Sequence, residues 1–212
     1  MKGPLFYSKI LLFGEYGIIE DSKGLSIPYN FFNGALKIPE LSDEESKKSN
    51  LVLSQFSSYL KTLDINLDLN SFDKHIKKGM YFDSSIPKGY GVGSSGALVA
   101  AVYEKYANSK ITVLENLTRE KLLVLKEIFS KMESFFHGNS SGLDPLNSYL
   151  SIPILIKSKN DINVTGIPSQ KSNGSGAVFL LDSGQSGSTA PMVNIFMEKM
   201  KKEGFRNMLN SQ

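Results

Sequence analysis

The spacing of apolar residues along the chain predicts a mixture of strands and helices. Apolar stretches, alternating or continuous, predict strands or strand-and-turn segments at residues 5–13, 24–38, 65–72, 152–156 and 177–181, with 18–19 resuming the first strand after a turn. Apolar residues that recur every three or four positions predict helices at residues 51–63, 118–136 and 190–209, and a run of small residues predicts another from 97 to about 108. The charged segment 40–50 predicts a surface loop or the start of a helix.

The composition indicates a soluble globular protein. Of the 212 residues, 41% are hydrophobic and 21% are charged, which suits one large domain, or one and a half, and excludes a disordered chain. The absence of cysteine excludes a disulfide scaffold and a thiolate metal site, and it fits an intracellular protein. The first residues lack the apolar core of a signal peptide, and no stretch approaches the ~18 apolar residues of a membrane span. We therefore expect a cytoplasmic protein with no membrane contact.

The charge distribution argues against nucleic acid as a partner. The net charge is only +3, and the basic residues other than Arg119 and Arg206 are lysines scattered among acidic residues. A protein that binds nucleic acid normally gathers its basic residues on one face. We expect no nucleic-acid partner.

The segment 87–97, PKGYGVGSSGA, is the part of the chain that most clearly predicts a ligand. Its glycines permit backbone angles that other residues avoid, and its paired serines lead into the predicted small-residue helix. A glycine-rich turn at a helix start presents unpaired backbone N–H groups and a partial positive charge, which together suit a phosphate. We expect the phosphates of a nucleotide to be bound by Gly89, Gly91, Val92, Gly93, Ser94, Ser95 and Gly96.

Other interpretations of this loop remain open from the residues alone. It is not a Walker A loop, because no Gly-Lys-Ser/Thr ends it. The string GVGSSG at 91–96 matches the dinucleotide-binding pattern, and the segment 111–115 supplies an apolar run and an acid downstream. The upstream segment 81–87 is half polar and ends in proline, which fits a Rossmann strand badly. A turn that binds nothing is the third interpretation, which the serines at the helix start disfavour.

Three charged side chains outside this loop have both a structural and a functional interpretation. Lys9 interrupts an apolar strand, as a solubilising residue on an edge strand does. Glu133 falls at the edge of the apolar stripe of the helix predicted at 118–136, where a carboxylate either turns out to water or has a cation as its partner. Asp144 closes a tight polar loop, either as a turn former before Pro145 or as a carboxylate aimed into a cleft.

The glycine-rich loop resembles the central motif of the GHMP kinases, a family that comprises galactokinase, homoserine kinase, mevalonate kinase and phosphomevalonate kinase. Two further segments are similar to motifs of the mevalonate kinases. Residues 9–19, KILLFGEYGII, resemble the N-terminal motif, with Tyr16 where a histidine is usual. Residues 133–144, ESFFHGNSSGLD, resemble the second block, and Pro145 departs from that block.

The resemblance implies a role for each of these residues. Ser95 and Glu133 are expected to bind Mg²⁺, Asp144 to face the hydroxyl of the acceptor, and Lys9 to lie beside Asp144 and the transferred phosphate. The segment 182–189 resembles the post-strand turn of the family, from which Thr189 is expected to approach the site. The substrate side is expected to comprise Glu15, Tyr16, His137, Asn139 and Ser141. For His137 a structural role is the favoured interpretation.

The resemblance also implies a two-domain α+β fold. Residues 1–155 are expected to form an ATP-binding domain like the second domain of ribosomal protein S5. Residues 156–212 are expected to begin a ferredoxin-like domain, incomplete because nothing like the third, C-terminal glycine-rich motif of the family is present. The implied function is an ATP- and Mg²⁺-dependent kinase that acts on mevalonate or a related isoprenoid-pathway alcohol, and a homodimer is one arrangement it allows. The alternatives are a non-catalytic nucleotide-binding protein or inactive fragment on the same fold and, less favoured, a Rossmann-type NAD-binding protein.

Overall fold

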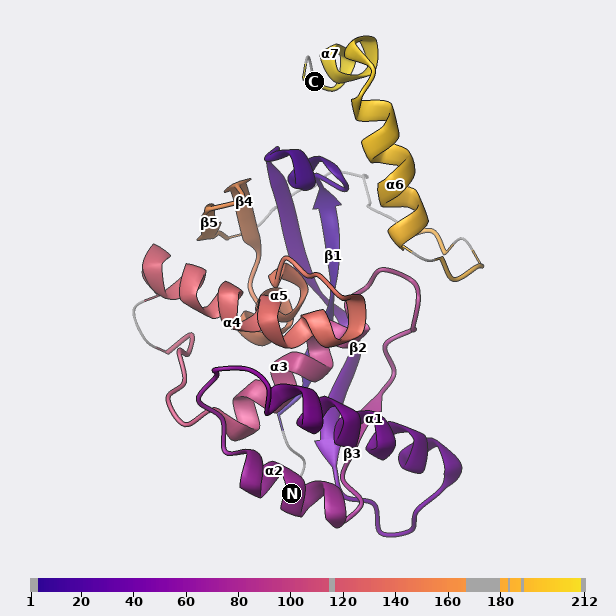
Figure 1. The fold of residues 1–212 in the computed structure, drawn as a ribbon, viewed down its shortest axis with the longest axis vertical. Helices are drawn as coiled ribbons and strands as arrows, with labels where there is room; N and C mark the ends of the chain where they lie inside the picture. The colour runs from indigo at the N-terminus through magenta and orange to yellow at the C-terminus, as the bar shows by residue number, and fades with distance from the viewer. Residues whose placement is uncertain (1–3, 115–116, 167–179, 183, 188, 211–212) are drawn as a thin grey trace, which may run out of the picture.

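The computed structural model describes residues 4–114, 117–166, 180–182, 184–187 and 189–210, and these residues form a mixed α+β fold (Figure 1). The strands are β1 (Phe6–Phe13), β2 (Gly24–Lys37), β3 (Tyr81–Ser84), β4 (Ile154–Ser158) and β5 (Asp161–Val164). The helices are α1 (Glu44–Leu60), α2 (Leu69–Lys77), α3 (Ser94–Tyr106), α4 (Arg119–His137), α5 (Leu143–Leu150), α6 (Thr189–Met200) and α7 (Glu203–Asn210), with a short 3-10 helix, η1, at Gly17–Glu20. The predicted α+β class is confirmed.

The long strand β2 organises an antiparallel sheet. It pairs with β1 along most of its length, with β4 near its start at residues 24–26 and with β3 near its end at residues 34–37. The strand order is β1-β2-β4-β5, with β3 beside β2. A register shift after Tyr7 interrupts the β1–β2 ladder, and the Ser8 hydroxyl donates a hydrogen bond to the Tyr29 carbonyl there (2.6 Å). Strands β4 and β5 continue this sheet past residue 155, and the predicted domain division at that residue stays a prediction.

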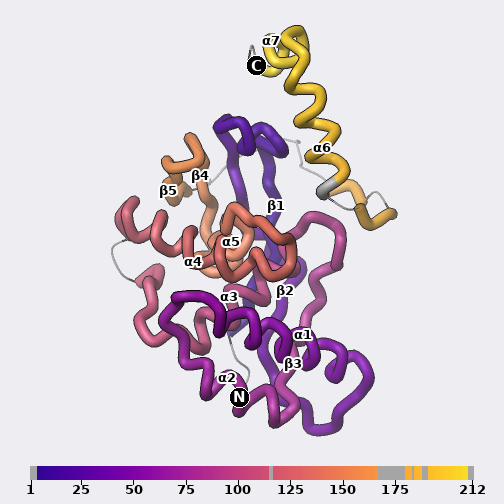
Figure 2. Tube along the Cα trace, in the orientation of Figure 1, coloured from indigo at the N-terminus to yellow at the C-terminus, as the bar shows by residue number. Residues whose placement is uncertain are grey.

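Helices α1 to α5 gather on one side of the sheet, as the ribbon and the Cα trace both show (Figures 1 and 2). Helix α3 is buried along nearly its whole length, which its small and apolar residues permit. It contacts β1, β2, α4 and α5, and therefore forms the centre of the core. The fully buried large side chains of the core include Leu53, Phe56, Phe72, Tyr103, Leu125, Phe129 and Leu146.

Several predicted elements differ from the observed ones. The strand predicted at 65–72 is wrong, because α2 begins at Leu69, where the Asp68 side chain accepts a hydrogen bond from the Ser71 N–H (3.0 Å) and so caps the helix. The alternation of apolar and polar residues over 65–72 therefore does not produce a strand, because the capped helix begins within that segment. Residues 18–19 lie in η1 and do not resume a strand. The segment 40–50 does contain a helix start, which a capping box between Asp43 and Ser46 fixes.

The C-terminal predictions are confirmed in part. The helix predicted at 190–209 is present as two helices, α6 and α7, separated by residues 201–202. Of the strand predicted at 177–181, residues 177–179 lie outside the described residues, and 180–181 are not in a strand. Helices α6 and α7 project beyond the tip of β1 (Figure 1). Among the described helices, none is long and apolar enough to cross a membrane.

Within the described residues, the C-terminal segment contacts the rest of the molecule at Tyr16 and at Gly89. The ring of Tyr16, just before η1, stacks on the ring of Phe196 in α6, with centroids 5.8 Å apart. The backbone N–H of Gly187 donates a hydrogen bond to the carbonyl of Gly89 (2.9 Å). The glycine-rich loop and the turn before η1 are therefore both in contact with the segment that leads into and forms α6.

Helix α3 approaches α5 most closely at Gly96. A Cβ at this position would lie 2.7 Å from the backbone carbon of Asp144 and 2.7 Å from the nitrogen of Pro145. We predict that Gly96→Ala forces the two helices apart and lowers the free energy of unfolding by about 1–3 kcal/mol, as overpacking of a core does. Urea denaturation followed by circular dichroism measures this change.

The control is Gly204→Ala in α7, where a Cβ would have nothing within 4 Å. This variant should unfold at the same urea concentration as the native chain, or at a higher one, because alanine favours a helix over glycine. Equal midpoints for Gly96→Ala and the native chain would show that α3 and α5 can separate at no cost.

Candidate active site

The glycine-rich loop is attached to the middle of strand β1. The backbone N–H of Lys9 donates a hydrogen bond to the carbonyl of Val92 (3.0 Å). Gly93 precedes α3 with a φ of 82°, a left-handed conformation that glycine adopts without strain. A Cβ on Gly93 would lie 3.0 Å from the Lys9 Cγ, so a larger residue would also collide with the lysine stem. The loop therefore brings the start of α3 directly beside Lys9.

The start of α3 has the features of a phosphate-binding helix terminus. No side chain caps the first turn of the helix. The backbone N–H groups of the first turn, at Ser94, Ser95 and Gly96, have no acceptor within the helix. They carry the partial positive charge of the helix dipole, which favours an anion.

An ion pair joins β1 to α5 at this place. The Lys9 Nζ lies 3.0 Å from the Asp144 Oδ1, and the exposed fractions of the two side chains are 8% and 36%. Asp144 lies in the first turn of α5, not in a loop, after Gly142 with a φ of 74°. The Ser148 hydroxyl donates a hydrogen bond to the Tyr7 carbonyl (2.8 Å) and holds α5 against β1. The buried lysine therefore meets a carboxylate that solvent, or a ligand, can still reach.

The electrostatic surroundings keep Lys9 charged. Burial alone would lower the pKa of its ammonium group, but the negative charge of Asp144 and the hydrogen bond to it, with smaller contributions from Glu15 and Glu133, outweigh burial. The net pKa of Lys9 is raised above its ordinary value. The Lys9 ammonium group therefore places a positive charge beside the start of α3.

A second polar cluster surrounds Glu133, which comes from α4. The side chain of Glu133 is buried, with 3% of the residue exposed. Its Oε1 accepts a hydrogen bond from the Ser95 hydroxyl (3.0 Å), and its Oε2 accepts one from the Ser140 hydroxyl. The Nε2 of His137 lies 3.0 Å from the same Ser95 oxygen. The glutamate thus belongs to the site and does not turn out to water.

Burial has a marked effect on the protonation of Glu133. Removal from water, with the nearby charge of Asp144, raises the pKa of its carboxyl group from 4.5 to about 7, against the opposing effects of the hydrogen bonds from Ser140 and Ser95 and of the charge on Lys9. A carboxylate that is costly to ionise in the protein alone becomes easier to ionise when a cation neutralises it.

Ser95 and Glu133 together could hold a magnesium ion. No group of three or more His, Cys, Asp and Glu suited to a metal occurs within the described part of the chain. A hydroxyl and a carboxylate oxygen at hydrogen-bond distance are hard oxygen donors, and Mg²⁺ commonly takes one or two such ligands from the protein and the rest from phosphate and water. The chemistry of these donors therefore fits Mg²⁺ that arrives with a nucleotide.

Of the residues predicted to bind the substrate, His137 lies at the site, where it contacts Ser95, and the others lie around it or elsewhere. Glu15 is exposed but close enough to Lys9 to affect its charge. Tyr16 uses its ring to contact α6, and Asn139 is exposed in the turn after α4. Helix α6 begins at Thr189, whose side chain lies outside what the structure describes.

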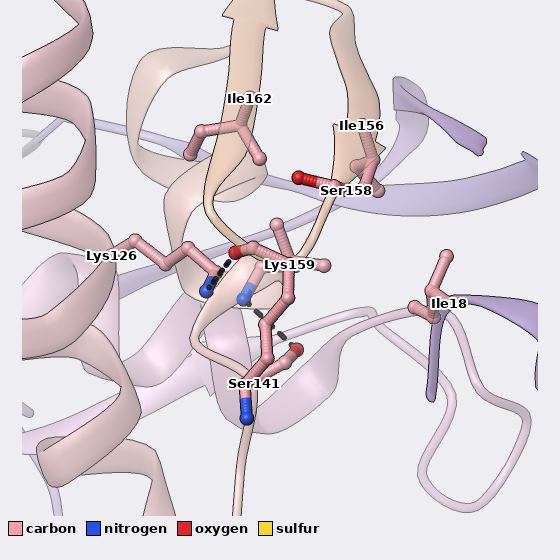
Figure 3. Close-up of a pocket in the computed structure, with 8 residues that line it drawn as sticks. Ile18, Lys126, Ser141, Ile156, Ser158, Lys159 and Ile162 are labelled. Atoms are coloured by element: carbon pink, nitrogen blue, oxygen red, sulfur yellow. Dashed lines mark hydrogen bonds between the residues drawn. The ribbon is translucent and has the colours of Figure 1, made fainter. Parts of the chain in front are cut away.

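Ser141 lies at a different place from the ion pair. Figure 3 shows it at a small cavity beside Lys126 of α4 and the turn between β4 and β5, where the Lys126 ammonium donates a hydrogen bond to the Lys159 carbonyl (3.1 Å). The Ser141 hydroxyl accepts a hydrogen bond from the Leu143 N–H (3.3 Å) and so supports the start of α5. Neither Glu133 nor Asp144 is among the residues that line this cavity.

Two contributors to the site were not identified from the sequence. Ser140, which donates to Glu133, is not part of the block resemblance, since that resemblance includes Ser141, one residue further along. The pair of adjacent serines is the sequence signal that points to it. The contact of Ser186 and Gly187 with Gly89 joins segments almost a hundred residues apart and had no local signal. The resemblance did lead to Lys9, Ser95, Glu133 and Asp144, which the structure gathers at one place.

Comparison with known proteins agrees with this arrangement. Residues 51–151 match the family described as GHMP kinases N terminal domain. Residues 51–151 therefore correspond to the N-terminal domain of the GHMP kinases. The matched range includes the glycine-rich loop, Glu133 and Asp144, and leaves Lys9 and the C-terminal helices outside it. The family predicted from the motifs is confirmed.

Solved mevalonate kinases share the fold of this GHMP kinase domain and its flanking segments. The L. major mevalonate kinase in complex with R-mevalonate is 17% identical, with a TM-score of 0.52, and the alignment covers 98% of this chain and 67% of that one. The Methanococcus jannaschii mevalonate kinase is 15% identical, with a TM-score of 0.55, covering 100% and 70%. A comparison with curated proteins found no match.

The raised pKa of Glu133 predicts how the stability of this chain depends on pH when no metal is present. Because the pKa is about 7 in the folded protein and 4.5 in the unfolded chain, the unfolded state loses this proton first as the pH rises. The free energy of unfolding should therefore fall between about pH 4.5 and pH 7, by about 3 kcal/mol in total. Urea denaturation with a chelator at a series of pH values measures this slope.

The variant Glu133→Gln should show a flatter dependence over the same pH range, because the titrating group is gone. Glu127→Gln on the same helix is the control, since Glu127 is exposed and pairs with Lys131 in solvent. If the free energy of unfolding depends on pH in the same way in the native chain and in Glu133→Gln, the buried carboxylate is not the cause of that dependence.

Proposed function

We propose that this chain is an ATP-dependent kinase that phosphorylates the hydroxyl group of a small metabolite. The observation that carries the proposal is the meeting of two pairs at the start of α3: Lys9 with Asp144, and Ser95 with Glu133. One pair suits the acceptor and the moving phosphoryl group, and the other suits a metal nucleotide. The GHMP kinase domain supports the same reaction class.

The phosphates of ATP would lie against the first turn of α3. Its free N–H groups and dipole stabilise negative charge, and the glycines of the preceding loop let the backbone approach the phosphates closely. Bound Mg²⁺, held by Ser95 and Glu133, would neutralise charge on the phosphate oxygens. Phosphoryl transfer requires mainly such positioning and charge neutralisation.

Lys9 and Asp144 would act on the acceptor. Asp144 is exposed enough for a hydroxyl to reach its carboxylate, which would take the hydroxyl proton as the new oxygen–phosphorus bond forms and ADP leaves. Lys9 keeps its charge despite burial, so it would orient Asp144 and stabilise the negative charge that develops on the transferred group.

We propose mevalonate, or a related isoprenoid-pathway alcohol, as the acceptor. The segment from Glu133 to Asp144 resembles the second block of mevalonate kinases, and the described residues share the fold of solved mevalonate kinases. A coupled assay of ADP release with mevalonate, phosphomevalonate, homoserine and galactose, with and without magnesium, tests the proposal. ATP binding without ADP release for any of these alcohols would favour a non-catalytic nucleotide-binding protein.

We predict that Asp144→Asn lowers the turnover number by about 10² or more while ATP affinity changes little. The amide has nearly the same shape as the carboxylate, but it cannot accept the hydroxyl proton. Turnover is measured by coupled ADP release with the best acceptor, and ATP affinity by calorimetry.

Asp83→Asn is the matched control for this variant. Asp83 also pairs with a lysine, Lys37, but both side chains are exposed on the strands β3 and β2. Its turnover should equal that of the native chain. Full turnover by Asp144→Asn would reject Asp144 as the group that receives the proton.

A further inference from the structure

Helix α4 presents two side chains to the same serine. Glu133 and His137 are four residues apart and therefore lie on one face of the helix, and His137 is its last residue. The Glu133 Oε1 and the His137 Nε2 each lie 3.0 Å from the Ser95 Oγ. Ser95, in the first turn of α3, is thus held between a carboxylate and an imidazole.

The number of hydrogen atoms at Ser95 limits which hydrogen bonds it can form with these two neighbours. The serine hydroxyl has one hydrogen to donate, and it has two neighbours. In the protein alone the hydroxyl donates to Glu133. With that hydrogen used, the 3.0 Å contact between the serine oxygen and the His137 Nε2 requires the imidazole to carry its hydrogen on Nε2 and to donate it. The second oxygen of Glu133 accepts a hydrogen bond from Ser140.

A bound cation would change which of these hydrogen bonds can form. A hydroxyl oxygen that faces a cation must turn its hydrogen away, because the partial charge on that hydrogen is repelled. Glu133 Oε1 would lie beside the same cation, so a hydrogen that turns away from the cation turns away from Oε1 as well. The remaining acceptor at hydrogen-bond distance is the Nε2 of His137, which accepts once its hydrogen is on the other ring nitrogen.

We propose that His137 is a positioning residue that orients the Ser95 hydroxyl for a divalent cation by accepting its hydrogen. This inference rests on the proposed function, since it assumes that the cation arrives with a nucleotide. It assigns His137 a place behind the serine and not on the acceptor, in contrast to its expected place among the substrate-binding residues. The imidazole suits this task because the same nitrogen donates in one state and accepts in the other.

The test measures metal binding directly. Manganese, as a paramagnetic substitute for magnesium, is titrated into the protein with a saturating non-hydrolysable ATP analogue, and free manganese is followed by electron paramagnetic resonance. His137→Phe should weaken manganese binding by about 10-fold or more, within the range seen when a partner behind a metal ligand is removed. His137→Gln, whose amide can accept the same hydrogen, should stay within about threefold of the native chain.

Two further variants separate positioning from a general structural effect. In a Ser95→Ala background, His137→Phe should cause no additional loss, because the hydroxyl that it orients is gone. His75→Gln changes the other histidine of the chain, which contacts Tyr106 at the opposite end of α3 from Ser95, and should bind manganese as the native chain does. His137 is exposed, so its replacement leaves the core intact, and an unchanged melting temperature verifies this.

The possible failures are distinguishable. Native-like manganese affinity in His137→Phe, or an equal loss in the Ser95→Ala background, overturns the role of His137 and leaves the proposed function standing. A native chain that binds neither manganese nor the ATP analogue overturns the proposed function and this inference together.

Discussion

At Gly96 the backbone of α3 lies against the backbone of α5 with no space for a side chain. This contact sets the geometry of the whole site, because the residue before it, Ser95, belongs to the proposed metal pair, and the residue it touches, Asp144, belongs to the ion pair. The sheet completes the arrangement from the other side. Strand β1 supplies Lys9, and the loop that starts α3 is hydrogen-bonded to the backbone of that same residue. The small residue at this helical position therefore lets the Ser95–Glu133 pair and the Lys9–Asp144 pair lie close together.

The charges of the site are unbalanced within the described residues, and this imbalance is consistent with a binding role. Lys9 is influenced by Asp144, Glu15 and Glu133, so one buried cation faces three carboxylates. The protein alone tolerates this partly by keeping a proton near Glu133, whose pKa is about 7. Proteins accept such unfavourable arrangements mainly where function requires them. A cation that binds beside these carboxylates would reduce their mutual repulsion.

The sequence predicts best the helices whose apolar residues recur every three or four positions over a long segment. The helix 118–136 has a clear apolar stripe, and it is present as α4 with Thr118 as its N-cap. The segment 65–72 alternates like a strand, yet the Asp68 cap turns it into the start of α2, and only the isolated pairing of Leu67 with Ala107 remains of the expected strand. For the site, the motif resemblance led to the four charged or hydroxyl groups that meet. The residues that position them, Ser140 and Ser148, act through tertiary contacts: Ser140 donates to Glu133, and Ser148 donates to the carbonyl of Tyr7.

Tyr16 shows how one departure from a family pattern is accommodated by the fold. The resemblance places a histidine at this position, on the acceptor side, but here the aromatic ring stacks on Phe196 of α6. The backbone of Tyr16 has a φ of 59°, which is strained for a residue with a side chain, so the surrounding contacts must hold it there. The stack supplies such a contact and brings the turn that carries Glu15 against α6. A second contact, from Gly187 to Gly89, attaches the glycine-rich loop to the segment leading into that helix. The turn that carries Glu15 and the glycine-rich loop therefore each contact the C-terminal part of the described chain, although no motif of the sequence links them to it.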